Sequence, residues 1–136
     1  MALIQPLVSS VQASDVDPTH VPGNENKTCG TLVAGLGYEF KIDPFPAYDD
    51  NGDEADNVHV YDDPDSALVV TVTVSEDGSF DFETNLAVNA VFVKGGNDGG
   101  NLYIYAPPTT SDDGLDTPTS QGISHVSFCF NEAPVA

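Results

Sequence analysis

The chain has 136 residues, enough for a single domain with a core, and its charge excludes two classes of partner. Twenty-two acidic residues stand against three lysines and no arginine, which gives a net charge of −19. Nucleic acids and anionic membrane surfaces both need basic patches, so neither is expected as a partner. No segment approaches the roughly 20 consecutive apolar residues of a membrane-spanning helix. The acidic excess is typical either of a surface adapted for solubility or of a protein that binds cations.

The first 20 residues are predicted to form an N-terminal arm that is separable from the rest of the chain. Its uncharged, apolar side chains suit a β-strand, and they are Leu3, Ile4, Leu7, Val8 and Val11. Such an arm can add as a strand to an exposed sheet edge of its own domain or of the next subunit. Passed head to tail between copies, this contact would build an open filament. The alternative is a signal-peptide remnant, since Val11-Gln12-Ala13 resembles the small-residue end of one.

Residues 21–136 are predicted to form one all-β domain. Short segments of alternating or continuous apolar residues are separated by turn residues, and they span 36–42, 58–61, 68–74, 79–83, 86–94, 101–105 and 123–130. No segment shows a helical period over three turns, so almost no helix is expected. An antiparallel β-sandwich of about seven to eight strands, with an N-terminal extension, fits this pattern best.

The segment Leu86–Lys94 is apolar at nearly every position, with Leu86, Val88, Ala90 and Phe92 facing one way. A strand that is apolar on both faces belongs in the middle of a sheet that is covered on both sides, or in a sheet with one face on the core and the other on a neighbour. The glycine-rich segment 95–100 then reverses the chain and predicts a hairpin with residues 101–105. Residues 107–121, which are polar and contain three prolines, are expected to be a long loop.

Two cysteines, Cys29 and Cys129, lie near opposite ends of the predicted domain. In an acidic, strand-rich chain with many prolines and glycines, a disulfide between them is the natural interpretation. Two free buried thiols are the alternative.

The second half of the chain resembles a recurrent module of secreted and cell-surface bacterial proteins. The similarity is carried by Ala87-Val-Asn-Ala-Val-Phe-Val-Lys-Gly-Gly96, the Tyr103/Tyr105 strand, Thr110-Ser-Asp-Asp-Gly-Leu115 and Gly122-Ile-Ser-His-Val-Ser-Phe-Cys129, and an earlier Gly37-Tyr-Glu-Phe-Lys41 strand follows the first cysteine. The resemblance covers residues 29–130. It implies an extracellular or cell-surface location, often within larger surface proteins. No activity is established for the module, so the resemblance contributes no catalytic residues.

An acidic segment supplies the candidate metal site. Asp49, Asn51, Asp53 and Asp56 place oxygen ligands on one loop, as hard cations such as Ca²⁺ require. The pattern departs from the EF-hand, because the glycine stands at position 52 and the twelfth position is Val60 instead of a bidentate glutamate. A calcium loop and a solvated acidic loop therefore both remain open.

Tyr103 and Tyr105 are candidate binding residues, since they are expected on one face of a strand, opposite Leu102 and Ile104. An exposed pair could stack on a sugar or anchor a protein interface; the alternative is that they pack against a neighbouring loop. No residue set indicates an enzyme, because adjacent strand residues such as Ser124 and His125 point to opposite faces.

These observations predict an extracellular structural or adhesive surface protein, self-assembling into a filament through its N-terminal strand. Its expected partners are other copies of itself or other surface proteins. The alternative is a calcium-assisted module that binds a glycan or peptide. Apart from Ca²⁺, no cofactor is expected.

Overall fold

The computed structural model describes residues 16–23, 27–96, 99–118 and 122–131, and these residues are mostly antiparallel β-sheet. The strands are β1 (Thr19–Val21), β2 (Tyr38–Ile42), β3 (Val58–Asp62), β4 (Val69–Val74), β5 (Phe80–Lys94), β6 (Gly100–Leu115) and β7 (His125–Phe130). A four-residue helix, α1 (Cys29–Leu32), precedes β2, and a 3₁₀ turn, η1 (Ala55–Asn57), leads into β3. The all-β prediction is confirmed. None of the helices in the described residues is long and apolar enough to cross a membrane.

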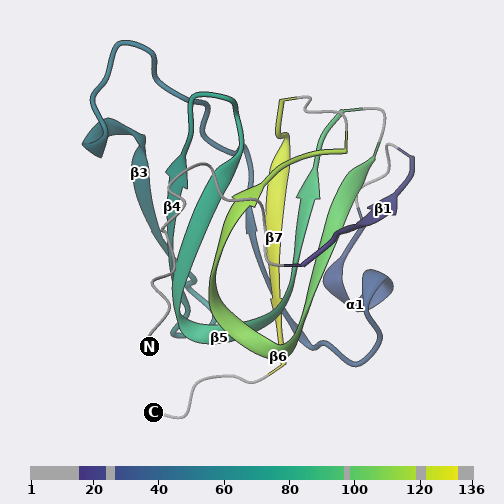
Figure 1. The fold of residues 1–136 in the computed structure, drawn as a ribbon. Helices are drawn as coiled ribbons and strands as arrows, with labels where there is room; N and C mark the ends of the chain where they lie inside the picture. The colour runs from purple at the N-terminus through teal and green to yellow at the C-terminus, as the bar shows by residue number, and fades with distance from the viewer. Residues whose placement is uncertain (1–15, 24–26, 97–98, 119–121, 132–136) are drawn as a thin grey trace, which may run out of the picture.

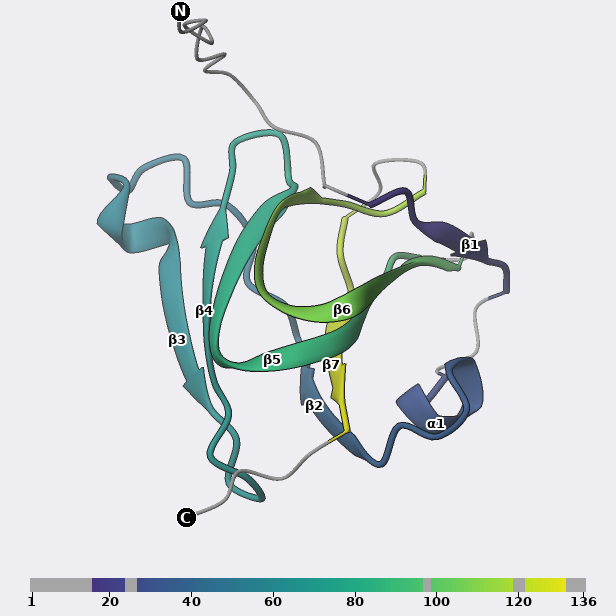
Figure 2. The same cartoon turned by 60° about the horizontal axis from the view of Figure 1, so that its bottom comes forward.

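The seven strands form one hydrogen-bonded sheet, which is bent along its two longest strands (Figures 1 and 2). Its main order is β1-β6-β5-β4-β3, and β7 pairs with β5 on one side and with β2 on the other. The first part of β5 pairs with β4, and its last part, from Ala90 to Lys94, pairs with β7. The β5–β6 hairpin therefore belongs to both halves of the sheet.

Irregular pairing in the hairpin accompanies this bend. Between Glu83 and Val88 of β5, and again between Val88 and Ala90, the register with β6 shifts. Such shifts insert unpaired residues into one strand and bend it. Because the strands form a single bent sheet instead of two separate sheets, the expected sandwich is not confirmed.

The main core lies against the inward faces of both halves of the sheet. It combines buried residues of β4, β5, β6 and β7, among them Val70, Val72, Phe80, Phe82, Val91, Tyr103, Val126 and Phe128. In β4 the alternation seen in the sequence is preserved, with Val70, Val72 and Val74 buried and the threonines between them half-buried. This is the burial expected of a strand with only one face on the core.

A second, smaller cluster explains why Leu86–Lys94 is apolar on both faces. Ala90, Phe92, Leu102 and the two cysteines form this cluster, and side chains of the α1 region pack against it. Val91 and Val93 face the main core, so the prediction of a strand covered on both sides is confirmed. Val88, however, joins the main core instead of sharing a face with Ala90, because the register shift between them reverses the alternation.

Two expected boundaries differ from the structure. Residues 107–115 were expected in a loop, but β6 continues to Leu115 and pairs with β5 through Thr109, Ser111 and Asp112. Pro107 and Pro108 lie between Ile104 and Thr109, where the register shifts, so their missing amide hydrogens cost no regular ladder bond. The predicted boundary between arm and body, after residue 20, falls inside β1.

Candidate functional site

The disulfide joins the α1 region to the central strand β7. Cys29 and Cys129 are bonded, with their Cα atoms 5.6 Å apart, and the predicted pairing is confirmed. Glu39 of β2 supports the same junction, because its carboxylate accepts hydrogen bonds from the Cys29 amide at 3.1 Å and from the Ser127 hydroxyl at 2.9 Å. The disulfide therefore lies buried in the smaller core, with the half-buried Glu39 carboxylate hydrogen-bonded beside it.

The four predicted calcium ligands lie together on the loop and the η1 turn before β3, and each of the three aspartates already accepts a backbone hydrogen bond with one carboxylate oxygen. Asp49 accepts from the Asn51 amide at 3.0 Å, and Asp53 and Asp56 each accept from the other's backbone amide, at 3.1 and 3.0 Å. The buried Asn57 side chain completes the loop: its Oδ1 accepts from the Asp49 amide at 2.7 Å. These contacts are typical of Asx turns that shape a loop.

The loop is also tightly closed around Gly52. A Cβ atom at this position would lie within 3.0 Å of the Asp56 and Asp49 side chains. Within the described residues, no group of three or more His, Cys, Asp or Glu side chains is arranged to hold a metal ion. Calcium binding by this loop stays a prediction.

Tyr103 and Tyr105 are not exposed, and the expectation that they form a binding surface is wrong. Both are buried in the main core, where the Tyr105 hydroxyl donates to Asp112 at 2.6 Å and the Asp116 amide donates to the Tyr103 hydroxyl at 3.1 Å. Ile104 between them is the exposed residue. The tyrosine face of β6 lies against the main core, and burial raises the pKa of Tyr103.

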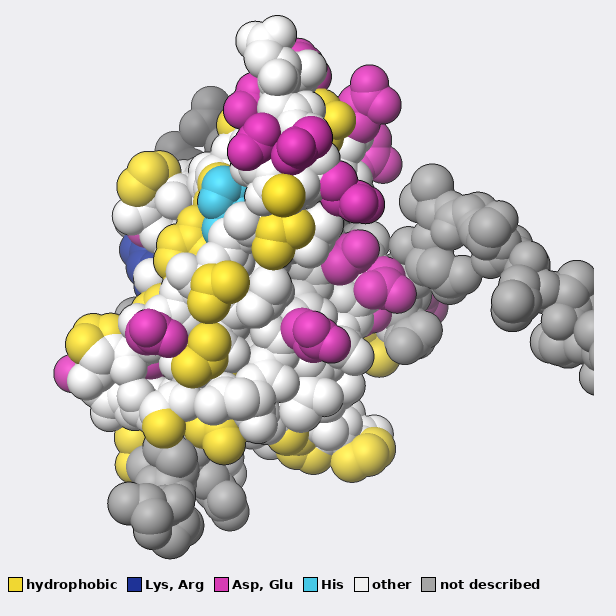
Figure 3. Space-filling view, turned by 90° about the vertical axis from the view of Figure 1, so that its left-hand side faces the viewer, with side chains coloured by type: hydrophobic (Ala, Val, Ile, Leu, Met, Phe, Trp, Pro, Cys, Tyr) yellow, Lys and Arg dark blue, Asp and Glu magenta, His cyan; other side chains and the backbone are white. Residues whose placement is uncertain are grey.

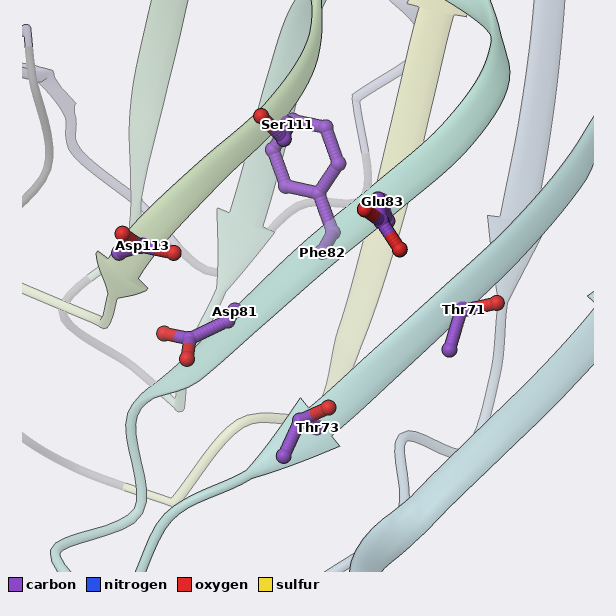
Figure 4. A pocket seen from close by; sticks show the side chains of 7 residues that line it. All are labelled: Thr71, Thr73, Asp81, Phe82, Glu83, Ser111 and Asp113. Atoms are coloured by element: carbon purple, nitrogen blue, oxygen red, sulfur yellow. The ribbon is translucent and has the colours of Figure 1, made fainter.

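The polar face of the sheet carries a shallow hollow that sequence analysis did not single out. Its volume is about 250 Å³, and its lining residues come from β4, β5 and β6: Thr71, Thr73, Asp81, Phe82, Glu83, Ser111 and Asp113 (Figure 4). Phe82 is buried and offers no stacking surface. Asp81 accepts a hydrogen bond from the Gly114 amide at 2.9 Å, which ties β6 to β5. Outward polar residues of this kind are ordinary for a sheet with one solvated face.

A more unusual feature is the edge strand β3. Within the described residues β3 pairs with β4 alone, and its outward side chains Val58 and Val60 are 37 % and 63 % exposed. Figure 3 views this side of the molecule: acidic side chains gather at one end, and hydrophobic side chains run down the face beside them. The alternation of residues 58–61 had predicted the strand, but no local signal could show that it ends the sheet.

A buried histidine on β7 has a shifted pKa. His125 is 1 % exposed, and its Nε2 atom has no hydrogen-bond partner. Burial lowers the pKa of His125 below its ordinary value of 6.5, the charges of Lys41 and Lys94 lower it further, and Asp43 and Glu39 oppose them. The folded state therefore holds this ring neutral at pH values where an unfolded chain would bind a proton.

We expect stability to fall as the pH drops below about 6.5, because only the unfolded state gains the His125 proton there. The contribution is fully present above that pH and is lost progressively down to the folded pKa, at no more than about 1.4 kcal/mol per pH unit. Urea denaturation between pH 7.5 and 5 measures it. In the variant His125→Gln this component should disappear, and an unchanged slope in the variant would contradict the assignment.

The predicted assembly residues Leu3, Ile4, Leu7, Val8 and Val11 lie outside the described residues. Comparison with known proteins adds no assignment: no protein-family model matches the chain, and neither does any curated protein or solved structure.

Proposed function

We propose that this protein is an extracellular structural or adhesive subunit that assembles with copies of itself, using its N-terminal segment as an added strand. The observation that carries this proposal is that the sheet has open edges. In the described residues, β1, β2 and β3 each pair on one side only. A sheet edge presents unpaired backbone donors and acceptors, which another strand can satisfy.

The disulfide supports the extracellular part of the proposal. Disulfides persist in oxidising compartments and are rare in the reducing cytosol. The Cys29–Cys129 bond spans 100 residues, and both cysteines are buried, so it belongs to the framework of the fold.

The charge distribution supports assembly through the N-terminal segment. Two bodies of net charge close to −19 repel each other on approach, so contact between their acidic surfaces is unfavourable. Residues 1–13 contain no charged side chain and include five aliphatic residues suited to a strand. This segment can approach a neighbouring copy with little electrostatic cost.

The experiment compares the full-length protein with the full-length variant Leu7→Asp/Val8→Asp, which places a charge on each face of the extended segment. The wild-type protein should form ordered polymers in electron micrographs and show a mass that rises with concentration in light scattering. The variant should remain monomeric, with an unchanged circular dichroism spectrum. Equal assembly of the two proteins would rule out the N-terminal segment as the linking element.

The alternative, a calcium-assisted glycan-binding module, needed both the acidic loop and an exposed tyrosine pair, and the second of these is absent. It needed Tyr103 and Tyr105 as a stacking surface, and both side chains are buried. We therefore favour self-assembly.

A further inference from the structure

We propose that β3 is the acceptor edge, and that residues 7–11 of a neighbouring copy pair with it, so that copies join head to tail. This inference rests on the proposed function and names the surface that receives the donated segment. In the described residues, β1, β2 and β3 are the strands with a single partner strand, and they differ in length, charge and exposed apolar area.

The two other edges are poor acceptors. Strand β1 has only three residues. Strand β2 carries Lys41 on its exposed side, in an ion pair with Asp43 at 3.6 Å, and a lysine on an edge strand discourages further pairing. Its exposed aromatic residue, Tyr38, already stacks on Phe130 with ring centroids 5.4 Å apart.

Strand β3 combines the required properties. It has five residues and no lysine, and two of the four large hydrophobic side chains exposed in the described residues, Val58 and Val60, lie on its outer face. An added strand places its side chains beside those of its neighbour, so the side chains of a donor strand would lie against both valines. Edge strands that expose apolar side chains in this way are what natural proteins usually avoid.

The donor segment is as long as β3 and carries no charged side chain. Residues 7–11 (LVSSV) are five residues long, like β3, and put Leu7 and Val11 on the same face of an extended strand. Pro6 stands just before them, where its missing amide hydrogen is harmless, because a donor strand at the new edge needs partners on one side only.

Electrostatic repulsion favours pairing of β3 with residues 7–11 over pairing of β3 with the β3 of a second copy. The acidic loop containing Asp49, Asp53 and Asp56 leads directly into β3, and Asp62 ends the strand. Pairing two β3 edges would bring these loops of two copies together, and like charges repel at such distances. The uncharged segment of residues 7–11 avoids that repulsion.

The topology makes the contact head to tail. Strand β1 stands at one end of the main strand order and β3 at the other, on opposite sides of the fold in both ribbon views (Figures 1 and 2). The described chain begins at Val16, which packs against the main core three residues before β1, so the donor segment precedes the strand at the opposite end of the order from β3. A contact between two different surfaces of the same protein adds copies one after another. It builds an open filament unless the rotation between successive copies closes a ring.

The test uses two matched full-length variants. Val60→Lys puts a charge in the middle of the acceptor edge, and Ile104→Lys puts the same charge on another exposed apolar residue, of β6, that is 47 % exposed. Val60→Lys should raise the concentration needed for half-maximal assembly by at least about tenfold, and Ile104→Lys should leave it within about twofold. Circular dichroism and the absence of free thiols show that each variant is folded.

A mixing experiment then separates the acceptor from the donor. Val60→Lys retains a donor, and Leu7→Asp/Val8→Asp retains an acceptor, so an equimolar mixture should form a 1:1 dimer and nothing larger in light scattering. If Val60→Lys assembles like the wild type while the donor variant does not, β3 is the wrong edge and the proposed function survives. If the wild-type protein stays monomeric at all concentrations, both proposals fall. A mixture that remains monomeric overturns the pairing of residues 7–11 with β3.

Discussion

Replacing both Cys29 and Cys129 by serine is expected to lower the free energy of unfolding by about 4 kcal/mol. The bond closes a segment of 100 residues, and a cross-link over such a length removes much of the conformational entropy of the unfolded chain. Both sulfur atoms also fill the smaller core beside Phe92 and Leu102, so the substitution puts hydroxyls into an apolar cluster. Urea denaturation of the wild type and the double variant measures the loss.

The single variant Cys29→Ser provides the first control, since it breaks the same bond and should lose nearly as much stability. Reducing the wild-type protein provides the second. Because both cysteines are buried, reduction should need partial unfolding and should proceed slowly in native buffer. A double variant within 1 kcal/mol of the wild type would show that the bond contributes little to folding.

Phe128→Ala is expected to lower the free energy of unfolding by about 3–5 kcal/mol. Phe128 is fully buried at the centre of β7, opposite Val91 of β5, and its ring meets that of Phe82 edge to face at 5.3 Å. The truncation leaves a cavity between the two halves of the bent sheet, where surrounding strands are held by hydrogen bonds and cannot close it.

Phe40→Ala is the matched control. Phe40 is the register partner of Phe128 on β2, but it is only half-buried at the margin of the core. Its removal exposes less apolar surface and leaves a site open to water, so we expect a clearly smaller loss. Denaturant titrations of both variants compare them, and an equal loss at the two positions would mean that the core is not centred on β7.

Local sequence patterns were sufficient where one strand face meets the core. The alternation of residues 68–74 predicted β4, and the two-sided apolar segment Leu86–Lys94 predicted a strand covered on both faces. Successive residues in a strand face opposite ways, so the positions of the apolar residues predict which side chains are buried. The alternation also put Tyr103 and Tyr105 on one face of a strand, but it could not show that this face lies inward, against the main core.

In the acidic loop, the sequence predicted where the carboxylates lie but not which hydrogen bonds they make. Its carboxylates lie where the sequence placed them, on one loop before β3, yet they accept hydrogen bonds from the loop's own backbone, and the buried Asn57 holds that loop closed. A ligand pattern lists the available oxygens but does not show how they are already used.

The amino-acid sequence by itself determined the all-β class, most of the strands, the disulfide pair and the strongly acidic surface, since each follows from local pattern or composition. The tertiary structure alone decided that the strands form a single bent sheet, that β6 continues through its prolines, and that β3 is left as an exposed edge. The physical reason is that sheet pairing joins residues far apart in the chain. Whether a strand has one neighbour or two is therefore a property of the whole fold.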